Sequence, residues 1–155
     1  MKGLLAGFLA GALIVASAPL GAQQKPNFSG NWNINQVKSN FGAVPAPDTF
    51  TRKIVHAEPS ITIDEEQASP LGVQQTQRKM TTDGKESVFD VSGADVKAIA
   101  TWEGSTLFVV TKVDVLGITY NDRMALSADG KTLTSVVKLD TPQGALDITV
   151  VFDKQ

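Results

Sequence analysis

The sequence contains no cysteine and only one histidine, His56, and these two shortages exclude several kinds of site. Without cysteine there can be no disulfide bond, no thiol redox centre and no lipid-modified N-terminal cysteine. A structural zinc site is excluded as well, because it takes its ligands mainly from cysteine and histidine. Small extracellular domains of eukaryotes tend to carry disulfides. The lack of cysteine therefore favours a bacterial protein that works in the periplasm or outside the cell.

Catalytic motifs are also missing, so we expect no enzyme activity, no cofactor and no bound metal. There is no Gly-x-Ser-x-Gly elbow, no phosphate-binding glycine loop and no dinucleotide fingerprint. A hydrolase or isomerase is the weaker alternative, and it would require His56 to lie beside Asp122 or Glu58 in a pocket. The acidic run Asp64-Glu65-Glu66 lacks the spacing of a calcium loop. It is predicted to be a solvated strand end.

The charges of the chain give no sign of a nucleic-acid partner. Residues 23–155 carry 13 Lys and Arg side chains and 16 Asp and Glu side chains, a formal net charge of −3. Charges of both signs are interspersed, whereas a nucleic-acid-binding domain is expected to present a clustered basic face. No segment after residue 22 is long and apolar enough to predict a membrane span.

The one long apolar run of the sequence lies at its N-terminus. Lys2 precedes an uncharged run from Leu4 to Val15 and a stretch of small residues that ends at Ala22. This order is typical of a secretory signal peptide. An uncleaved anchor is the alternative, but about a dozen apolar residues are fewer than the roughly 20 that a span requires. Cleavage after Ala22 is favoured over cleavage after Ala18, which would leave a proline at the new N-terminus.

The remaining segment, residues 23–155, predicts a single all-β domain. Turn dipeptides that contain glycine recur every 9 to 14 residues between Gly84 and Gly144. Glycine supplies the positive φ of hairpin turns, and turns at this spacing are typical of a sandwich or a barrel. Between them, apolar and polar residues alternate with the period of two that marks a half-buried strand. The predicted strands are 31–36, 50–58, 60–66, 73–82, 86–91, 96–102, 106–113, 132–139 and 145–152, and alternation over 118–126 makes a count of nine or ten.

Two segments differ from this pattern. The connection from Val37 to Asp48 contains one glycine and two prolines, which disfavour a helix and predict an ordered loop. The segment from Val73 to Thr82 is rich in Gln, Thr, Arg and Lys. It is interpreted either as a solvated edge strand or as the polar wall of an internal cavity.

The first predicted strand carries Gly30-Asn31-Trp32, a Gly-x-Trp ahead of an antiparallel meander. This arrangement resembles the calycins, which include the lipocalins and the intracellular fatty-acid-binding proteins. The resemblance implies one up-and-down antiparallel β-barrel of about 8–10 strands, in which Trp32 plugs one end and Gly30 lets the strand bend. The stretch from Phe28 to Pro47 also resembles small secreted bacterial proteins.

Three departures from the fatty-acid-binding proteins and lipocalins limit what the resemblance implies. Fatty-acid-binding proteins have two short helices between the first strands, where this chain has only the proline-containing loop from Val37 to Asp48. They also end on an Arg-x-Tyr that holds the ligand carboxylate, and residues 148–153 contain neither residue. Lipocalins place a basic residue near the last strand, over the Trp, and here only Lys154 could take that place. The resemblance therefore implies the barrel without the carboxylate site of that family.

Polar residues share a strand face with apolar ones at three positions. Asp122 is in phase with Tyr120 and Met124, and Arg52 and His56 are in phase with neighbouring apolar residues. If these faces point inward, the charges need partners, and Arg52 and Asp122 could meet or address a polar group on a ligand. The simpler alternative is a β-bulge that reverses the phase and turns them to water.

These patterns predict a non-enzymatic, exported protein that binds an apolar or amphipathic small molecule inside the barrel. Late strands supply bulky apolar side chains and early strands supply polar ones, which favours a cavity with one apolar and one polar wall. A protein-binding module with a packed barrel, such as an inhibitor or an envelope accessory protein, is the alternative, with the Val37–Asp48 loop as its contact surface. The candidate ligand-binding residues, with Arg52 as polar anchor, are Phe50, Arg52, Ile54, Tyr120 and Met124.

We predict that the exported protein begins at Gln23. The small residues that end at Ala22 match the preference of signal peptidase, and cleavage there removes residues 1–22. The intact mass of protein recovered from outside the cytoplasm measures this directly. A mass that retains residues 1–22 would contradict the prediction.

Overall fold

The computed structural model of the protein describes residues 25–155. The predicted signal peptide, residues 1–22, lies outside the described residues. The only helix in the described part is a single 3-10 turn, Asp114–Leu116, and no helix there is long and apolar enough to cross a membrane. The strands are β1 Gly30–Ile34, β2 Thr49–Ala57, β3 Ser60–Ser69, β4 Gly72–Thr81, β5 Glu86–Val91, β6 Ala94–Glu103, β7 Thr106–Val113, β8 Ile118–Leu126, β9 Thr132–Thr141 and β10 Gly144–Lys154.

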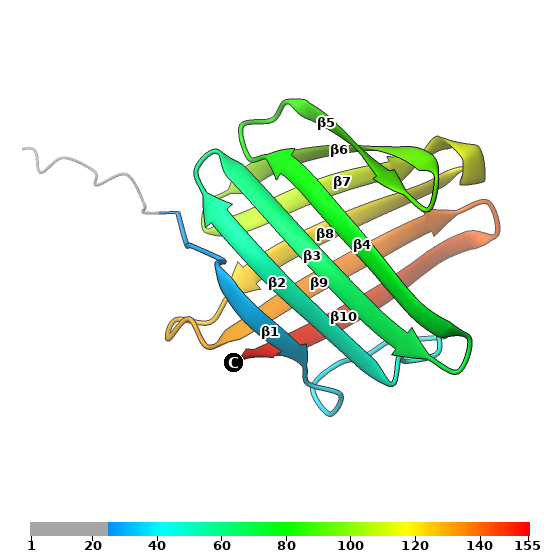
Figure 1. The fold of residues 1–155 in the computed structure, drawn as a ribbon, viewed down its shortest axis with the longest axis horizontal. Helices are drawn as coiled ribbons and strands as arrows, with labels where there is room; N and C mark the ends of the chain where they lie inside the picture. The colour runs from blue at the N-terminus through cyan, green and yellow to red at the C-terminus, as the bar shows by residue number, and fades with distance from the viewer. Residues whose placement is uncertain (1–24) are drawn as a thin grey trace, which may run out of the picture.

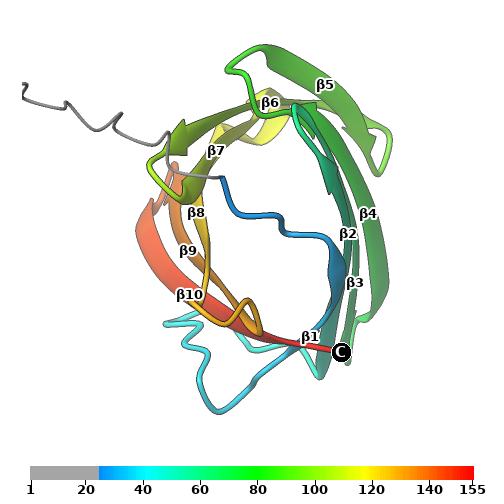
Figure 2. The ribbon, with the colours of Figure 1, turned by 90° about the vertical axis from the view of Figure 1, so that its left-hand side faces the viewer.

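The ten strands form one antiparallel sheet that curls into a nearly closed barrel (Figures 1 and 2). Each strand pairs with the next strand in the sequence, except that β4 and β5 form no ladder. In addition, β1 pairs with β10, which joins the first strand to the last one. The predicted all-β, up-and-down barrel is therefore confirmed. Because β4 and β5 are the two free edges of the sheet, the polar segment that begins at Val73 is an edge strand, as one of its two interpretations required.

The interior of the barrel follows from the period-two alternation of the strands. In β2, every second residue from Phe50 to His56 is buried and the residues between them are exposed. The same alternation on the other strands directs the large apolar side chains inward. The buried core includes Trp32, Phe50, Ile54, Ile61, Ile63, Met80, Phe89, Val96, Leu107, Val109, Met124, Leu133, Val150 and Phe152.

The long connection between β1 and β2 contains no helix, as its prolines predicted. It is attached to the outside of the barrel through Asn40, which exchanges two backbone hydrogen bonds of 2.7 Å with Thr149 of β10. The Gln36 side chain also donates a hydrogen bond to the Pro47 carbonyl at 2.6 Å, which joins the two ends of the loop. The loop therefore has a fixed position beside β10.

One end of the barrel is plugged by Trp32 and by the segment that precedes β1. This segment crosses the end that faces the viewer in Figure 2. The indole nitrogen of Trp32 donates a hydrogen bond to the carbonyl of Phe28 at 3.0 Å, and both side chains are fully buried. The Phe28 ring stacks with His56 and Trp102 at centroid distances of 5.8 Å. We call this the plugged end, and the opposite one the open end.

Gly30 and Lys154 complete the surroundings of Trp32. Gly30 has a φ of +147°, which side-chain-bearing residues rarely adopt, and a Cβ at this position would lie 2.7 Å from Cε of Lys154. The Lys154 ammonium group lies 5.3 Å from the centre of a Trp32 ring. The lysine thus occupies the place over the Trp that the lipocalin resemblance implies.

We predict that Trp32→Ala lowers the free energy of unfolding by about 3–5 kcal/mol, because truncation of a buried aromatic residue loses burial and leaves a cavity. Chemical denaturation followed by circular dichroism measures the change. Val136→Ala, on the exposed outer face of β9, is the control and should cost less than about 0.5 kcal/mol. Equal midpoints for Trp32→Ala and the wild type would argue against a plug.

Candidate functional site

A network of buried charged side chains crosses the interior of the barrel. Glu65 of β3 accepts hydrogen bonds from Arg52 of β2 and Arg78 of β4, with distances of 2.6 Å from Arg52 Nε and 3.0 Å from Arg78 Nη2 to the same oxygen. The Arg52, Glu65 and Arg78 side chains are 5%, 12% and 11% exposed. One carboxylate therefore neutralises part of the charge of two guanidinium groups in a place with little water.

The network continues from Arg52 to the opposite side of the barrel. Nη1 of Arg52 donates to Oγ of Ser135 on β9 at 2.8 Å, and the Ser135 hydroxyl donates to Oδ2 of Asp122 on β8 at 3.3 Å. Arg52 and Asp122 thus both point inward and are joined through one serine. The β-bulge that would have turned them to water is not present, because β2 and β8 keep an unbroken ladder register with their neighbours.

Burial and charge act in opposite directions on the two carboxyl groups. Burial tends to raise the pKa of Glu65, but the charges of Arg78 and Arg52 and their hydrogen bonds lower it below its usual value. Burial also raises the pKa of Asp122, and the more distant positive charges do not overcome it. Glu65 is therefore held ionised, whereas Asp122 takes up a proton more readily than an exposed aspartate.

Two buried atoms of the network lack a hydrogen-bond partner among the described residues. They are Nε of Arg78 and Oδ1 of Asp122, which lie at the two ends of the network. Buried polar atoms in folded proteins nearly always have a partner, whether protein, water or ligand. The network therefore presents one donor and one carboxyl oxygen that a guest molecule could match.

The interior differs on the two sides of the network. Toward the plugged end the inward side chains, such as Ile61, Leu107 and Leu133, are fully buried. Toward the open end several inward residues are only half-buried, and Tyr120 is 37% exposed. The open half of the barrel is therefore less completely buried than the plugged half. The half-buried residues of this part are Gln67 and Thr76 on β3 and β4, and Val137, Leu139, Leu146 and Ile148 on β9 and β10.

The five predicted ligand-binding residues all belong to inward-facing positions of β2 and β8. Phe50, Arg52, Ile54 and Met124 are buried, and Tyr120 lies toward the open end. The Arg52 guanidinium lies over the ring of Phe50, with its central carbon 5.1 Å from the ring centre. Their contact with a ligand remains a prediction.

Three partners of Arg52 and Asp122 were not among the predicted site residues: Glu65, Arg78 and Ser135. Glu65 was assigned to a solvated strand end, and this is wrong, because the acidic run lies within β3. Alternation sends Glu65 into the barrel, while Asp64 and Glu66 point outward. The signal that could have identified Glu65 was its phase, which it shares with Ile61 and Ile63.

His56 and Glu58 do lie together, at the plugged end of the barrel. Nε2 of His56 is 2.9 Å from Oε1 of Glu58, and Nδ1 accepts from the backbone N–H of Phe28 at 3.3 Å. Burial opposes ionisation of Glu58, but hydrogen bonds from His56, Lys25, Thr82 and Trp102 lower its pKa to about 2. Because both ring nitrogens of His56 are engaged, this pair holds the plug in place.

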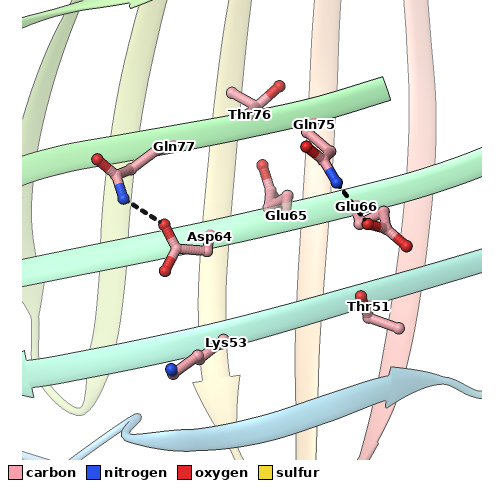
Figure 3. Close-up of a pocket in the computed structure, with 8 residues that line it drawn as sticks. All are labelled: Thr51, Lys53, Asp64, Glu65, Glu66, Gln75, Thr76 and Gln77. Atoms are coloured by element: carbon pink, nitrogen blue, oxygen red, sulfur yellow. Dashed lines mark hydrogen bonds between the residues drawn. The ribbon is translucent and has the colours of Figure 1, made fainter. Parts of the chain in front are cut away.

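A hollow in the described surface lies on the outside of the barrel, across β2, β3 and β4 (Figure 3). It has a volume of about 550 Å³ and a polar lining, in which Asp64 and Glu66 accept hydrogen bonds from Gln77 and Gln75 at 2.6 and 2.7 Å. A smaller hollow of about 270 Å³ lies where β1 ends and β2 begins, beside Phe50. Among the described residues no group of His, Asp and Glu is placed to hold a metal ion.

Comparison with known proteins relates the chain to calycin folds. No family model and no curated protein matches the sequence. Among solved structures, the fold is similar to zebrafish ileal bile acid-binding protein in complex with cholic acid (TM-score 0.61, 20% identity, 83% of this chain and 98% of that one). It is also similar to fatty-acid-binding protein 1 of Echinococcus granulosus (0.59, 12%, 82% and 96%) and to secretory abundant heat soluble protein 4 of Ramazzottius varieornatus (0.63, 12%, 86% and 99%). These identities relate the folds alone.

We predict that Glu65→Gln lowers the free energy of unfolding at neutral pH by about 3 kcal/mol or more, because it leaves buried guanidinium groups without a counter-charge. Since the folded-state pKa of Glu65 is lowered, its charge stabilises the fold above the pKa of the unfolded chain, and this contribution is lost as the pH falls. The difference from the wild type should therefore shrink in acid. Denaturant titrations at neutral and acid pH measure both effects.

The matched control is Glu66→Gln. Glu66 is the next residue in the chain but points outward and bonds only to the exposed Gln75. Its substitution should change the stability by less than about 0.5 kcal/mol. Similar losses for the two variants would mean that burial of Glu65 between two arginines has no special role.

Proposed function

We propose that the protein binds an amphipathic small molecule in the open half of its barrel, with the polar group of the guest against the Arg52–Asp122 network. The observation that supports this is the position of the network: it lies between the fully buried half of the interior and the half whose inward side chains are only half-buried. It also offers the unmatched Arg78 Nε and Asp122 Oδ1 at that boundary. The half-buried side chains of β9 and β10 supply an apolar wall for the rest of the guest.

The balance of polar and apolar groups favours an amphipathic guest over a purely apolar one. An apolar guest in contact with Arg78 and Asp122 would leave both buried atoms unmatched, and an unsatisfied buried polar group costs about 1–3 kcal/mol. A polar head group matches them, and an apolar tail gains about 25 cal/mol for each Å² that it removes from water. The similar solved structures named for a ligand are binding proteins of bile acid and fatty acid, which agrees with a guest of this class.

We further propose that the protein is exported and that its mature chain begins at Gln23. The apolar run from Leu4 to Val15 and the small residues that end at Ala22 support this proposal, and Lys25 contacts the barrel, with its ammonium group 3.1 Å from Glu58. Only two residues then separate the proposed cleavage site from the plugged end. A periplasmic or secreted carrier without enzyme activity is the function that we favour.

A protein-binding role is the second candidate, and exposed apolar residues at the turns favour it. Leu71 in the β3–β4 turn and Val115 and Leu116 between β7 and β8 are exposed, and both turns lie at the open end (Figure 1). Val37 in the long loop is exposed as well. A partner that covers these side chains would bind outside the barrel. It would therefore not depend on the inward residue Tyr120.

We predict saturable, micromolar binding of the neutral, environment-sensitive dye N-phenyl-1-naphthylamine to the folded protein. Tyr120→Glu should weaken this binding by about ten-fold or more, because it places a charge on the wall that the apolar rings contact. Fluorescence titration measures the affinity, and circular dichroism checks that the variant keeps its β-structure.

Val136→Glu is the matched control for this experiment. Val136 lies on β9, the strand beside Tyr120, but faces outward and is exposed. Its substitution should leave dye affinity unchanged. If the wild type saturably binds neither this dye nor its sulfonated relative 1-anilinonaphthalene-8-sulfonate, binding inside the barrel is refuted and the protein-binding candidate takes its place.

A further inference from the structure

The buried network has an unequal number of positive and negative groups unless Asp122 is ionised. Arg52 and Arg78 carry two positive charges, because guanidinium groups do not lose their proton in proteins. Glu65 supplies one negative charge between them. Whether the network as a whole is neutral or carries one net positive charge therefore depends on Asp122 alone.

The surroundings of Asp122 contain few other ionisable groups. From β9 it meets the hydroxyl of Ser135, and its partner on β7 is the apolar Val109. The charged groups that act on it across the barrel are Arg52 from β2, Arg78 from β4 and Glu65 from β3. Asp122 makes no ion pair with either arginine, since its one hydrogen bond is to Ser135. Its charge is therefore poorly compensated, and its second oxygen has no partner.

We propose that Asp122 selects the charge of the head group that the barrel accepts, by binding an anionic amphipath together with one proton. This inference rests on the proposed binding of an amphipathic guest in the open half of the barrel. With Asp122 protonated, the network has one unmatched positive charge, and an anion at Arg78 Nε neutralises it. The protonated carboxyl also becomes a hydrogen-bond donor, which suits an anionic oxygen.

With Asp122 ionised, the preference is reversed. The network is then neutral, and an anion entering it would meet a second negative charge in a place of low dielectric constant, which is unfavourable. The unmatched Oδ1 is then an acceptor and Arg78 Nε remains a donor, a pair that an uncharged hydroxyl or amide group can satisfy. The proton on Asp122 thus decides between anionic and uncharged guests. Burial raises the pKa of this carboxyl, so Asp122 keeps its proton to a higher pH than an exposed aspartate does.

Two dyes with the same ring system test this inference. 1-Anilinonaphthalene-8-sulfonate keeps its negative charge throughout the accessible pH range, and N-phenyl-1-naphthylamine lacks the sulfonate and is uncharged. Affinities of both dyes for the mature protein are measured by fluorescence between about pH 5 and about pH 9. We expect the affinity of the anionic dye to fall by about ten-fold or more as the pH rises and Asp122 ionises, while the neutral dye shows no such loss.

Asp122→Asn supplies the decisive comparison, because an amide is isosteric with the carboxyl group but stays uncharged. The variant should bind the anionic dye with an affinity that no longer depends on pH and that matches the wild type in acid. Asp147→Asn, an exposed aspartate of β10, is the control and should retain the wild-type pH dependence. Calorimetry of the wild type in two buffers of different ionisation enthalpy measures proton uptake without any substitution. It should show uptake with the anionic dye only.

The outcomes separate this inference from the proposed function. Binding of both dyes with no pH dependence and no proton uptake would leave binding inside the barrel intact and overturn the role of Asp122. A pH dependence that Asp122→Asn retains would overturn it as well. If neither dye binds, the proposed function fails, and the inference fails with it.

Discussion

Burial of Glu65 between Arg52 and Arg78 is the interaction on which the interior of this barrel depends. Three ionised side chains in a nearly dry space are tolerated only because each hydrogen bond between them replaces part of the lost hydration. The same contacts connect β2, β3 and β4 on their inner face, beside the buried apolar side chains of Ile54, Ile63 and Met80. The ion pairs therefore add to the hydrophobic packing that holds these three strands together.

The network also explains why the two halves of the barrel differ. On the plugged side, Trp32 and Phe28 fill the space between the walls, and the interior resembles an ordinary apolar core. Arg78 and Asp122 occupy inward positions that apolar side chains fill elsewhere in the core. Beyond this charged layer the inward side chains of β9 and β10 are only half-buried.

Much of the fold could be predicted from the sequence, because turn glycines and alternation are local signals. The inward position of Arg52 followed from the phase that it shares with Phe50 and Ile54. Glu65 was missed because its two acidic neighbours made the segment look solvated, although every second residue of a strand faces inward. Ser135 was missed for a different reason: its contact with Arg52 joins β2 to β9, strands that do not pair. That contact depends on the curvature and stagger of the closed sheet, which no local pattern contains.

The pairing of β1 with β10 has a consequence for the order in which the molecule assembles. Trp32 lies opposite Lys154, so the two strands that complete the wall come from opposite ends of the domain. Contacts between distant parts of a chain form late and slowly, because a long loop must close first. During synthesis, β1 has no partner on this side until β10 has emerged from the ribosome. The wall that joins β2 to β9 through β1 and β10 therefore stays incomplete until β10 can pair with β1.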